Sequence, residues 1–461
     1  MRTDMFIGGE WTSGSAGTFP VLDPSTGEPI TEVARAGLDD LDRALKAAHE
    51  AQPLWAAAAP RERSEVLRKA FDAMIARRDE IAALIVREMG KSLADALAEV
   101  TYAAEFLRWF AEEAVRIGGE LRTAPAGANR ILTFKRPVGV ALLLTPWNFP
   151  AAMATRKIGP ALAAGCTVVL KPAEDTPLTA LVLAEIFADA GAPAGVVNVV
   201  TTDRPGEIAS AALADSRVRK VSFTGSTPVG RLLLAQAAER VVNASMELGG
   251  NAPFIVLDDA DLEAAVRGAM LAKMRNYGQA CTAANRFLIH ESVAGEFTGM
   301  LVSAMNQVAT GPLVNEKAVA GVERKVDFSG GRVLLGGKRD PGPGFRYPPT
   351  VVTDVPRDSV LVTEEIFGPV ASIVPISGDE DAIAVANSVE MGLTGYVYTR
   401  DLARGLRMSE RLEVGMVGLN RGLVSDPAAP FGGVKQSGLG REGGFEGIEE
   451  YLETAYVATS W

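Results

Sequence analysis

Residues 138–150 read VGVALLLTPWNFP, an apolar run that ends in a short loop between two prolines. A continuous apolar run of this length is typical of a strand that is buried on both faces. Residues 151–164 then predict a helix, and TVVLKP (167–172) predicts a second buried strand. Buried strands joined by helices indicate a parallel sheet with right-handed connections, which places the chain in the α/β class.

The alternation of strand and helix extends outward from this stretch in both directions. Residues 262–419 form a second α/β stretch, and the first 37 residues read as short strands and turns. Upstream, helices are expected at 38–52, from Pro60 continuing to Ile85, and from Ser92 to Gly118. Downstream, the expected elements are a helix at 178–190, a strand at 196–201, a helix at 207–213, a strand at 218–225, a helix at 229–240 and short strands at 244–250 and 253–258.

One segment interrupts this order. Residues 120–137, ELRTAPAGANRILTFKRP, predict two strands around a glycine-containing turn. A hairpin between α/β elements is expected to project from the body as an arm. Its exposed edges need a partner, which favours a dimer or a tetramer.

Composition excludes several classes of protein. The formal net charge of −11 disfavours binding to nucleic acid or to anionic membranes. No apolar run approaches the ~18 residues of a membrane span, and the N-terminus is too polar for a signal peptide. The two cysteines, Cys166 and Cys281, form no disulfide framework, which favours a reducing compartment. A cytoplasmic protein is therefore expected.

The stretch RNYGQACTAANR (275–286) contains Cys281 between the small residues Gly278 and Ala280, so a substrate can approach the thiol. A lone cysteine is also commonly a small buried hydrophobe. The only histidines, His49 and His290, have no partner at zinc spacing and no nucleophile motif nearby. No metal site is expected, and a base for Cys281 is expected to be a carboxylate.

Two strand ends carry residues suited to a nucleotide. In SFTGSTPVGR a strand ends and Gly225-Ser226 turns into a helix, whose N-terminus can bind a pyrophosphate. The alternative is an ordinary strand-to-helix turn. In LKPAEDTP, Lys171 and Glu174 can hydrogen-bond ribose hydroxyls, or they form a solvated ion pair. A literal GxGxxG at 438–443 follows a loop and lies in no βαβ unit, so it predicts no dinucleotide site.

Two further strand ends carry candidate catalytic groups. Asn148 in TPWNFP lies on a rigid backbone, and its amide can donate to an oxyanion. Glu247 in MELGGNAPF follows a strand beside two glycines, which leave its carboxylate accessible. The alternative for Glu247 is a surface or capping glutamate. Four strand-end motifs together with an accessible cysteine predict a catalytic site.

These motifs, in this order, resemble the aldehyde dehydrogenase superfamily over nearly the whole chain, and most closely its succinate-semialdehyde dehydrogenase branch. The matching segments are TPWNFP (145–150), KPAEDTP (171–177), FTGSTPVG (223–230), MELGGNAP (246–253), GQACTAANR (278–286), EEIFGP (364–369) and PFGGVKQSGLGREG (430–443).

The resemblance implies a catalytic role for five residues. Cys281 matches the nucleophile and Glu247 the general base, while Asn148 and the Cys281 N–H match the oxyanion hole. Lys157 and Glu442 match positions that relay protons. The implied reaction is aldehyde oxidation through a cysteine thiohemiacetal and a thioester. A site that lowers the pKa of Cys281 and raises that of Glu247 would suit this chemistry.

The resemblance also implies a cofactor site. A carboxylate at Glu174 accepts from a ribose 2′-hydroxyl and repels a 2′-phosphate, which favours NAD, with NADP as the alternative. The implied cofactor-binding residues are Thr145, Trp147, Lys171, Glu174, Gly225, Ser226, Gly230, Glu365 and Phe367.

In the succinate-semialdehyde branch, residues matching Arg156, Arg275 and Ser425 hold a substrate carboxylate, for which the planar guanidinium is well shaped. The alternative is that both arginines are structural. Succinate semialdehyde is the expected substrate. Glutarate semialdehyde, an aromatic or aliphatic aldehyde, and a non-oxidative role as thioester hydrolase or cofactor-binding protein are the alternatives.

The implied fold has an NAD-binding domain (1–118 and 138–249), a catalytic α/β domain (250–440) and a small oligomerisation arm (119–137 and 441–461). Some features depart from the branch. Tyr277 is bulkier than usual and is expected to narrow the substrate tunnel. Ala283 replaces a second cysteine, which excludes a local disulfide, and the connections at 305–313 and 325–333 are short.

Overall fold

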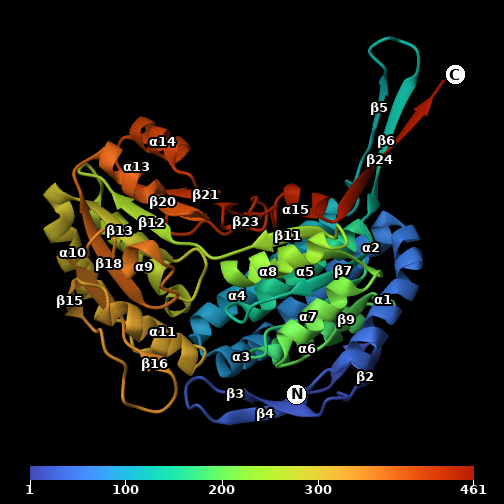
Figure 1. The fold of residues 1–461 in the computed structure, drawn as a ribbon, viewed down its shortest axis with the longest axis horizontal. Coiled ribbons are helices and arrows are strands. Elements are labelled where there is room, and N and C mark those ends of the chain that lie inside the picture. Colours follow the sequence, from blue (N-terminus) through green and yellow to red (C-terminus); the bar gives the residue numbers. More distant parts are fainter. Residues whose placement is uncertain (461) are drawn as a thin grey trace.

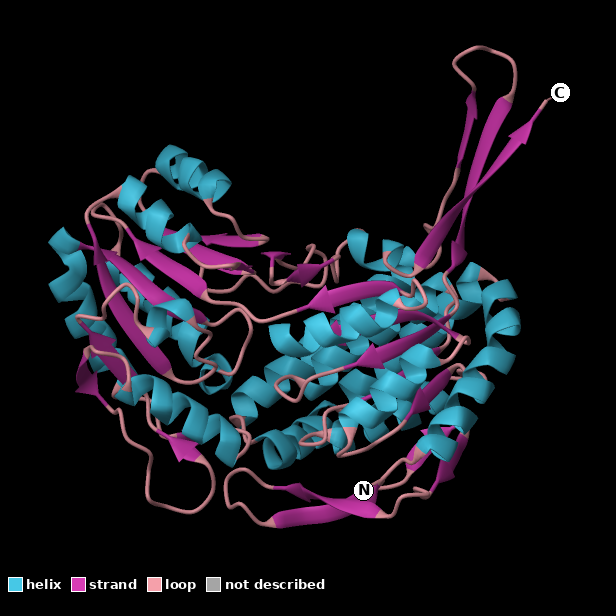
Figure 2. Cartoon of the chain, in the orientation of Figure 1, coloured by secondary structure: helices cyan, strands magenta, loops and turns pink. Residues whose placement is uncertain are grey.

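Two twisted sheets, each covered by helices, lie side by side in the computed structural model, which describes residues 1–460 (Figure 1). A third sheet of three strands extends away from one of them (Figure 2). The alternating strands and helices confirm the α/β class that the sequence predicts. No helix in this part of the chain combines the length and the apolar character needed to cross a membrane.

The first sheet is built around the stretch that begins at Val138. Its strand Val140–Leu144 is fully buried, as expected for a parallel strand covered on both faces. Five neighbouring strands are parallel, and antiparallel strands lie at the two ends. In sheet order the strands are β2 (Glu10–Thr12), β1 (Met5–Ile7), β9 (Val197–Val199), β8 (Val168–Lys171), β7 (Val140–Leu144), β10 (Val218–Thr224), β11 (Asn243–Glu247) and β23 (Gly438–Leu439).

Helices cover both faces of this sheet. Ala141 and Leu143 of β7 pack on one side against α2, α4, α5 and α6, whereas Val140 and Leu142 pack on the other against α1, α7 and α8. The helices are α1 (Leu38–Ala57), α2 (Pro60–Ala76), α3 (Arg78–Met89), α4 (Leu93–Glu113), α5 (Pro150–Ala164), α6 (Pro177–Asp189), α7 (Pro205–Ala214) and α8 (Thr227–Ala238).

The expected single helix from Pro60 to Ile85 is two helices, and that prediction is wrong. The break falls at Arg77, whose φ and ψ of −100° and 15° leave the helical region. The Arg77 guanidinium there pairs with Glu80 and with Glu185 of α6. The change of direction lets both α2 and α3 pack against α4 and α6.

The second sheet has six parallel strands and one antiparallel edge strand. In sheet order they are β15 (Arg332–Leu335), β17 (Thr350–Thr353), β18 (Val370–Ile376), β13 (Ala284–His290), β12 (Ala252–Val256), β20 (Thr394–Tyr398) and β21 (Met416–Leu419). The remaining helical elements are α9 (Leu262–Met274), η1 (Arg275–Gly278), α10 (Glu291–Met305), α11 (Glu316–Asp327), α12 (Val360–Thr363), α13 (Asp379–Asn387), α14 (Leu402–Arg411) and α15 (Glu446–Glu449).

Short two-stranded sheets complete the body. They pair β3 (Thr18–Leu22) with β4 (Pro29–Ala34), β14 (Gly311–Pro312) with β16 (Arg346–Tyr347), and β19 (Met391–Gly392) with β22 (Val434–Lys435). The two short connections join α10 to β14 and α11 to β15.

The arm contains the hairpin of β5 (Glu120–Thr123) and β6 (Arg130–Pro137) together with β24 (Leu452–Thr459), which pairs with β6 along its whole length. It extends far from both sheets (Figure 1). The expected C-terminal boundary of the arm at residue 441 is too early. Residues 441–451 lie instead against the body, because Ile448 and Tyr451 belong to the core between α5 and the first sheet.

Candidate active site

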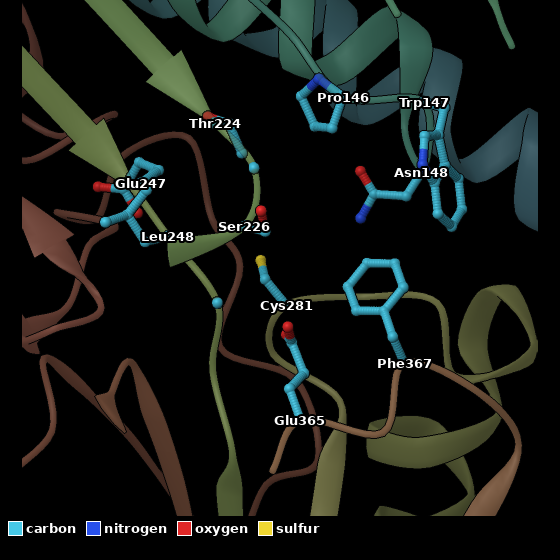
Figure 3. Close-up of a pocket in the computed structure, with 12 residues that line it drawn as sticks. Pro146, Trp147, Asn148, Thr224, Ser226, Glu247, Leu248, Cys281, Glu365 and Phe367 are labelled. Carbon is cyan, nitrogen blue, oxygen red and sulfur yellow. The ribbon is translucent and has the colours of Figure 1, made fainter. Parts of the chain in front are cut away.

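The two sheets meet at the ends of their strands: carboxyl ends in the first sheet and amino ends in the second. Loops at the carboxyl ends of β7, β10 and β11 face loops that precede the amino ends of β12, β13 and β18. A pocket lies between them, and it brings together Cys281, Glu247 and Asn148, the residues that the sequence analysis selected as nucleophile, base and oxyanion donor (Figure 3). Its lining consists of Pro146, Trp147, Asn148, Thr224, Gly225, Ser226, Glu247, Leu248, Gly249, Cys281, Glu365 and Phe367.

Cys281 is half-buried between η1 and β13. Its sulfur points into the space near Ser226 and Asn148 (Figure 3). Burial raises the pKa of the thiol to about 12, although the charge of Arg156 lowers it. The expectation that the site lowers this pKa therefore fails for the protein without ligand, because so little water solvates the thiolate.

The turn before Cys281 has an uncommon backbone. Asn276 and Tyr277 have φ values of 52° and 51°, in the left-handed region that glycine normally occupies. The Tyr277 ring packs against Gly311 of β14, and it does not line the pocket. The expectation that Tyr277 narrows the tunnel is therefore wrong, because the left-handed turn directs its ring toward the short 305–313 connection.

Glu247 ends β11 on the opposite side of the pocket (Figure 3). Its carboxylate is buried, and neither oxygen has a hydrogen-bond partner among residues 1–460. Burial, reinforced by the charge of Glu442, raises the pKa of Glu247 well above its ordinary value. A buried carboxylate without a partner is costly, and a raised pKa is what a base or acid near neutral pH requires.

Asn148 is held on three sides. Its amide Nδ2 donates to the Gln279 carbonyl at 3.1 Å, which leaves a second N–H free to donate. Its backbone carbonyl accepts from Lys91 Nζ and from Asn276 Nδ2, both at 2.8 Å. The amide therefore has a fixed direction beside the Cys281 sulfur, as a donor to a developing oxyanion needs.

Sequence reasoning missed the support behind Asn148. Lys91 forms a fully buried ion pair with Glu99 of α4. Glu99 Oε1 accepts from the Ala151 N–H at 2.9 Å, in the first turn of α5. This pair fixes the loop and the helix that carry Asn148 and Arg156. No sequence pattern indicates the role, since Lys91 stands alone between two helices.

Glu442 lies between two cations of α5. Lys157 Nζ contacts its Oε1 at 2.5 Å, and Arg156 Nε contacts its Oε2. Burial alone raises the pKa of Glu442, but Arg156 and Lys157 outweigh it and hold the pKa below its ordinary value. The glycines of the 438–443 segment have left-handed backbone angles and form the loop that carries this carboxylate.

A second polar region surrounds Arg275. Its guanidinium lies 4.8 Å from the centre of the Phe149 ring and forms no ion pair within residues 1–460. Arg156 lies over the Phe431 ring at 4.2 Å, and the charges of Arg156 and Arg275 both lower the pKa of Cys281. Ser425 lines an adjacent groove formed by residues 415–431.

Tyr102 of α4 completes this region, and sequence reasoning missed it because it falls within an apolar helix stripe. Its hydroxyl oxygen is buried without a hydrogen bond among the described residues. Burial raises the pKa of Tyr102, while Arg156, Arg275 and Ser425 act to lower it, so these three groups are its polar neighbours. A hydroxyl beside two guanidinium groups suits an anion that all three can bind as donors.

The cofactor-side residues fit a dinucleotide. Ser226 precedes α8 and gives its first turn no side-chain cap, so N–H groups remain available to an anion. The buried Thr224 hydroxyl also lacks a partner among the described residues. Lys171 and Glu174 lie 3.3 Å apart at the end of β8, with Glu174 partly exposed. Thr145 follows β7 on the same sheet edge, and Gly230 contacts Leu248.

Glu365 and Phe367 close the other wall of the pocket. Glu365 Oε1 accepts from the Gly250 N–H at 3.1 Å, and burial raises the pKa of Glu365 to about 7. Phe367 has a left-handed φ of 56°, and its ring packs edge-on against Trp147 at 5.4 Å. The contact between Phe367 and Trp147 joins the loop before β18 of the second sheet to the loop that follows β7.

Comparison with known proteins agrees with this geometry. The model of the aldehyde dehydrogenase family matches residues 11–457. The chain belongs to the aldehyde dehydrogenase family. This aldehyde dehydrogenase is 53% identical to a succinate-semialdehyde dehydrogenase of Paenarthrobacter nicotinovorans, over 93% of this chain and 98% of that protein.

Solved structures show the same fold. The crystal structure of a succinate-semialdehyde dehydrogenase from Burkholderia pseudomallei superposes on this aldehyde dehydrogenase with a TM-score of 0.98 and 46% identity, covering 100% of this chain and 98% of the other. An NADP-dependent enzyme of E. coli gives the same TM-score, identity and coverage. This aldehyde dehydrogenase is accordingly an oxidoreductase that oxidises an aldehyde with NAD or NADP.

Proposed function

We propose that this enzyme oxidises succinate semialdehyde to succinate, with Cys281 as the nucleophile. The observation that carries the proposal is the pair Arg156 and Arg275 beside the buried hydroxyl of Tyr102, with both guanidinium charges near enough to the Cys281 thiol to lower its pKa. A carboxylate there receives two guanidinium groups and a hydroxyl donor. An aldehyde at the other end of a short chain then lies at the thiol.

Asn148 supports the first step. Addition of the Cys281 sulfur to the aldehyde carbon forms a C–S bond, and the carbonyl oxygen becomes an oxyanion. The free N–H of Asn148 and the backbone N–H of Cys281 donate to that oxygen. The thiol proton leaves to a carboxylate, and Glu247 is the unpartnered carboxylate of the pocket.

A bound NAD(P) would supply the hydride acceptor for the carbon that is bonded to Cys281, so that a thioester would remain on the sulfur. The chain's part in positioning it falls to the uncapped start of α8 and to Glu365 and Phe367. Glu247 then takes a proton from water, whose oxygen attacks the thioester carbon. The C–S bond breaks and succinate leaves. Its raised pKa makes Glu247 a stronger base than a solvated carboxylate.

The residues around Glu174 favour NAD over NADP. Glu174 is partly exposed, and its carboxylate would repel a 2′-phosphate while accepting from a 2′-hydroxyl. Lys171 sits 3.3 Å from that carboxylate, so part of the repulsion is neutralised. Comparing kcat/KM for the two cofactors tests the preference, and a clear advantage for NADP would refute it.

The arm supports assembly into a homodimer or homotetramer. Leu121, Phe134 and Tyr456 of its three strands are exposed at 62%, 43% and 59%. Large apolar side chains on an open sheet are commonly covered by a second copy. Light scattering of the whole chain and of a Phe134→Asp variant tests the assembly.

We further assign cofactor binding to residues 1–118 and 138–249 and catalysis to residues 250–440, and we propose that the enzyme is cytoplasmic.

A panel assay tests the proposed substrate. NADH formation is measured with succinate semialdehyde, glutarate semialdehyde, and neutral aliphatic and aromatic aldehydes. Succinate semialdehyde should give the highest kcat/KM, because its carboxylate reaches the arginines while its carbonyl reaches Cys281. A neutral aldehyde with equal or higher kcat/KM would contradict the proposal, and a preference for glutarate semialdehyde would move it to the longer substrate.

A further inference from the structure

The short turn η1, at residues 275–278, begins with Arg275 and lies just before Cys281. Asn276 and Tyr277 within it have φ and ψ values of 52° and 35°, and of 51° and 37°, in the left-handed region. Two successive residues of this kind are uncommon, and such strain persists only where the surroundings impose it. The contacts that impose it also set where the Arg275 guanidinium and the Cys281 sulfur lie.

One group of contacts holds η1 within the half of the molecule that contains the second sheet. Gly278 lies so close to Gly368 that a Cβ atom on Gly278 would lie 2.2 Å from the Gly368 carbonyl oxygen. Gln279 Oε1 accepts from the Val314 N–H at 3.0 Å, and Gln279 Nε2 donates to the Asn276 carbonyl at 3.2 Å. These contacts shape the turn, but they do not align it with the oxyanion donor on the first sheet.

Two hydrogen bonds join η1 to the half of the molecule that contains the first sheet. Asn276 Nδ2 donates to the Asn148 carbonyl at 2.8 Å. The backbone N–H of Asn276 donates to Asp95 Oδ2 at 3.1 Å, across 181 residues of the chain. A carboxylate is a stronger acceptor than a carbonyl. Asp95, in the first turn of α4, is therefore the second anchor of the turn on the first-sheet side.

The face of α4 that carries Asp95 also carries other supports of the site. Glu99, one helical turn after Asp95, accepts from the Ala151 N–H at 2.9 Å, at the start of α5. Tyr102 follows about one turn later, with its hydroxyl beside the two arginines of the proposed carboxylate site. Residues three and four apart share one face of a helix. One face of α4 thus contacts η1, the start of α5 and the carboxylate site.

Helix capping alone does not account for the direction of the Asp95 carboxylate. An acidic residue in the first turn of a helix is favourable by itself, because it lies near the positive end of the helix dipole. The start of α4 is already capped, however, by Ser92 Oγ, which accepts from the Asp95 N–H at 3.1 Å. The Asp95 carboxylate accepts instead from Asn276 of η1. It is used for a contact between the two halves of the molecule.

We propose that Asp95 is a positioning residue, which holds Arg275 and Cys281 in the alignment with Asn148 that an anionic aldehyde requires. The proposal rests on the proposed function, in which Arg275 binds the substrate carboxylate while the carbonyl carbon lies at Cys281. Asp95 acts through the Asn276 N–H. What the site requires at position 95 is therefore a hydrogen-bond acceptor of the right length.

Steady-state kinetics of Asp95→Ala test the alignment. The value of kcat should fall by about tenfold or more with both succinate semialdehyde and butanal, because the thiol no longer faces the carbonyl carbon in a fixed direction. KM should rise for succinate semialdehyde, which depends on Arg275, and stay within about twofold for butanal and for NAD. Asp95→Asn should restore kcat to within about threefold, because the amide oxygen accepts from the same N–H. Equal losses in Asp95→Ala and Asp95→Asn would overturn the proposal.

Asp79→Ala is the matched control. Asp79 lies in the first turn of α3, and its side chain is 84% exposed beside Arg78. The control removes the same kind of helix-dipole interaction and should leave kcat and KM unchanged, whereas a loss as large as that of Asp95→Ala would overturn the proposal. Asp95→Ser gives a second reading should Asp95→Ala fail to fold, because its hydroxyl is too short to reach η1, and it should show the same losses.

Alkylation by iodoacetamide tests the position of the turn without any substrate. In cofactor-free Asp95→Ala, Cys281 should react about threefold faster or more at pH 8, because a released turn admits water to a thiol whose burial raises its pKa. Cys166 is fully buried and should stay unlabelled, which shows that the variant is folded. Labelling of Cys281 at the rate of the unchanged enzyme would overturn the proposal. An unchanged enzyme that forms no NADH from succinate semialdehyde would instead refute the proposed function, and the labelling would still test Asp95.

Discussion

The strand ends that form the pocket are built differently in the two sheets. On the first sheet, Asn148, Ser226 and Glu247 follow the carboxyl ends of regular buried strands. On the second sheet, Cys281 and Phe367 lie on turns before strands begin, and these turns contain the left-handed residues Asn276, Tyr277 and Phe367. Strained turns of this kind occur where the surroundings force them.

This difference separates two tasks. In the proposed mechanism, the regular strand ends hold the base, the oxyanion donor and the cofactor surface in a fixed frame, at the carboxyl ends where open α/β sheets bind ligands. The irregular turns of the second sheet bring the thiol across to that frame. Loss of the Cys281 thiol should therefore remove the reaction, whereas changes at the strand ends of the first sheet should leave partial steps.

The largest loss of activity is expected from replacing Cys281, which lies in the loop before β13 of the second sheet. Cys281→Ser should lower NADH formation by about 10⁴-fold or more, because the alcohol is a far weaker nucleophile than the thiol. Cys166→Ala is the control, since Cys166 is buried beside Tyr451 and away from the pocket. Steady-state assays of both variants measure the effect, and comparable losses would mean that Cys281 is a structural cysteine.

On the first-sheet edge, Asn148→Ala should lower kcat by about 10²- to 10³-fold, because one donor to the oxyanion is lost. Binding of cofactor, measured by fluorescence titration, should change little. A loss of cofactor affinity as large as the loss of kcat would show that Asn148 supports the loop after β7 and not the reacting oxygen.

The carboxylate region should separate substrates. Tyr102→Phe and Arg275→Ala should each raise KM for succinate semialdehyde by about tenfold or more, because a hydrogen bond to a charged group is lost. KM for a neutral aliphatic aldehyde should stay within about twofold. Kinetics with both substrates measure this, and equal increases for both would make these residues structural.

The last prediction concerns the pH dependence of the Cys281 thiol, which does not depend on turnover. Because burial raises the pKa of Cys281 to about 12, the thiolate fraction is small at neutral pH and grows about tenfold per pH unit below that value. Alkylation of the cofactor-free enzyme by iodoacetamide should therefore keep rising from pH 6 to pH 9 with no plateau. A plateau near neutral pH would indicate a thiol that is already activated without cofactor.

The difference between the strand ends of the two sheets also explains which site residues the sequence alone could bring together. Asn148, Gly225 and Glu247 lie at the ends of strands that the sequence predicts, so the topology of a parallel sheet is enough to bring them together. The structure gathers Cys281 around the same pocket, but only the family resemblance gave it that neighbourhood in advance, because it precedes a strand. Its catalytic role stays a prediction, as do the roles of the other site residues.

Other features lie beyond any local pattern. Lys91 and Tyr102 act through contacts with segments far along the chain, and nothing in their own helices marks them. The direction of the Tyr277 ring depends on a left-handed turn that its sequence neighbours do not signal. The polar face of β10 and β11 becomes visible only when their register is known, since Lys220 and Ser245 are otherwise ordinary strand residues.

The central claim is that a thiol on one edge and a carboxylate on the other act in sequence on one substrate. It is tested most directly by intact-protein mass spectrometry of Glu247→Gln after mixing with succinate semialdehyde and NAD. The account predicts one succinyl group held on Cys281 as NADH forms in a single burst, and no adduct in Cys281→Ser. Continued turnover without an adduct, or an adduct on another residue, would contradict it.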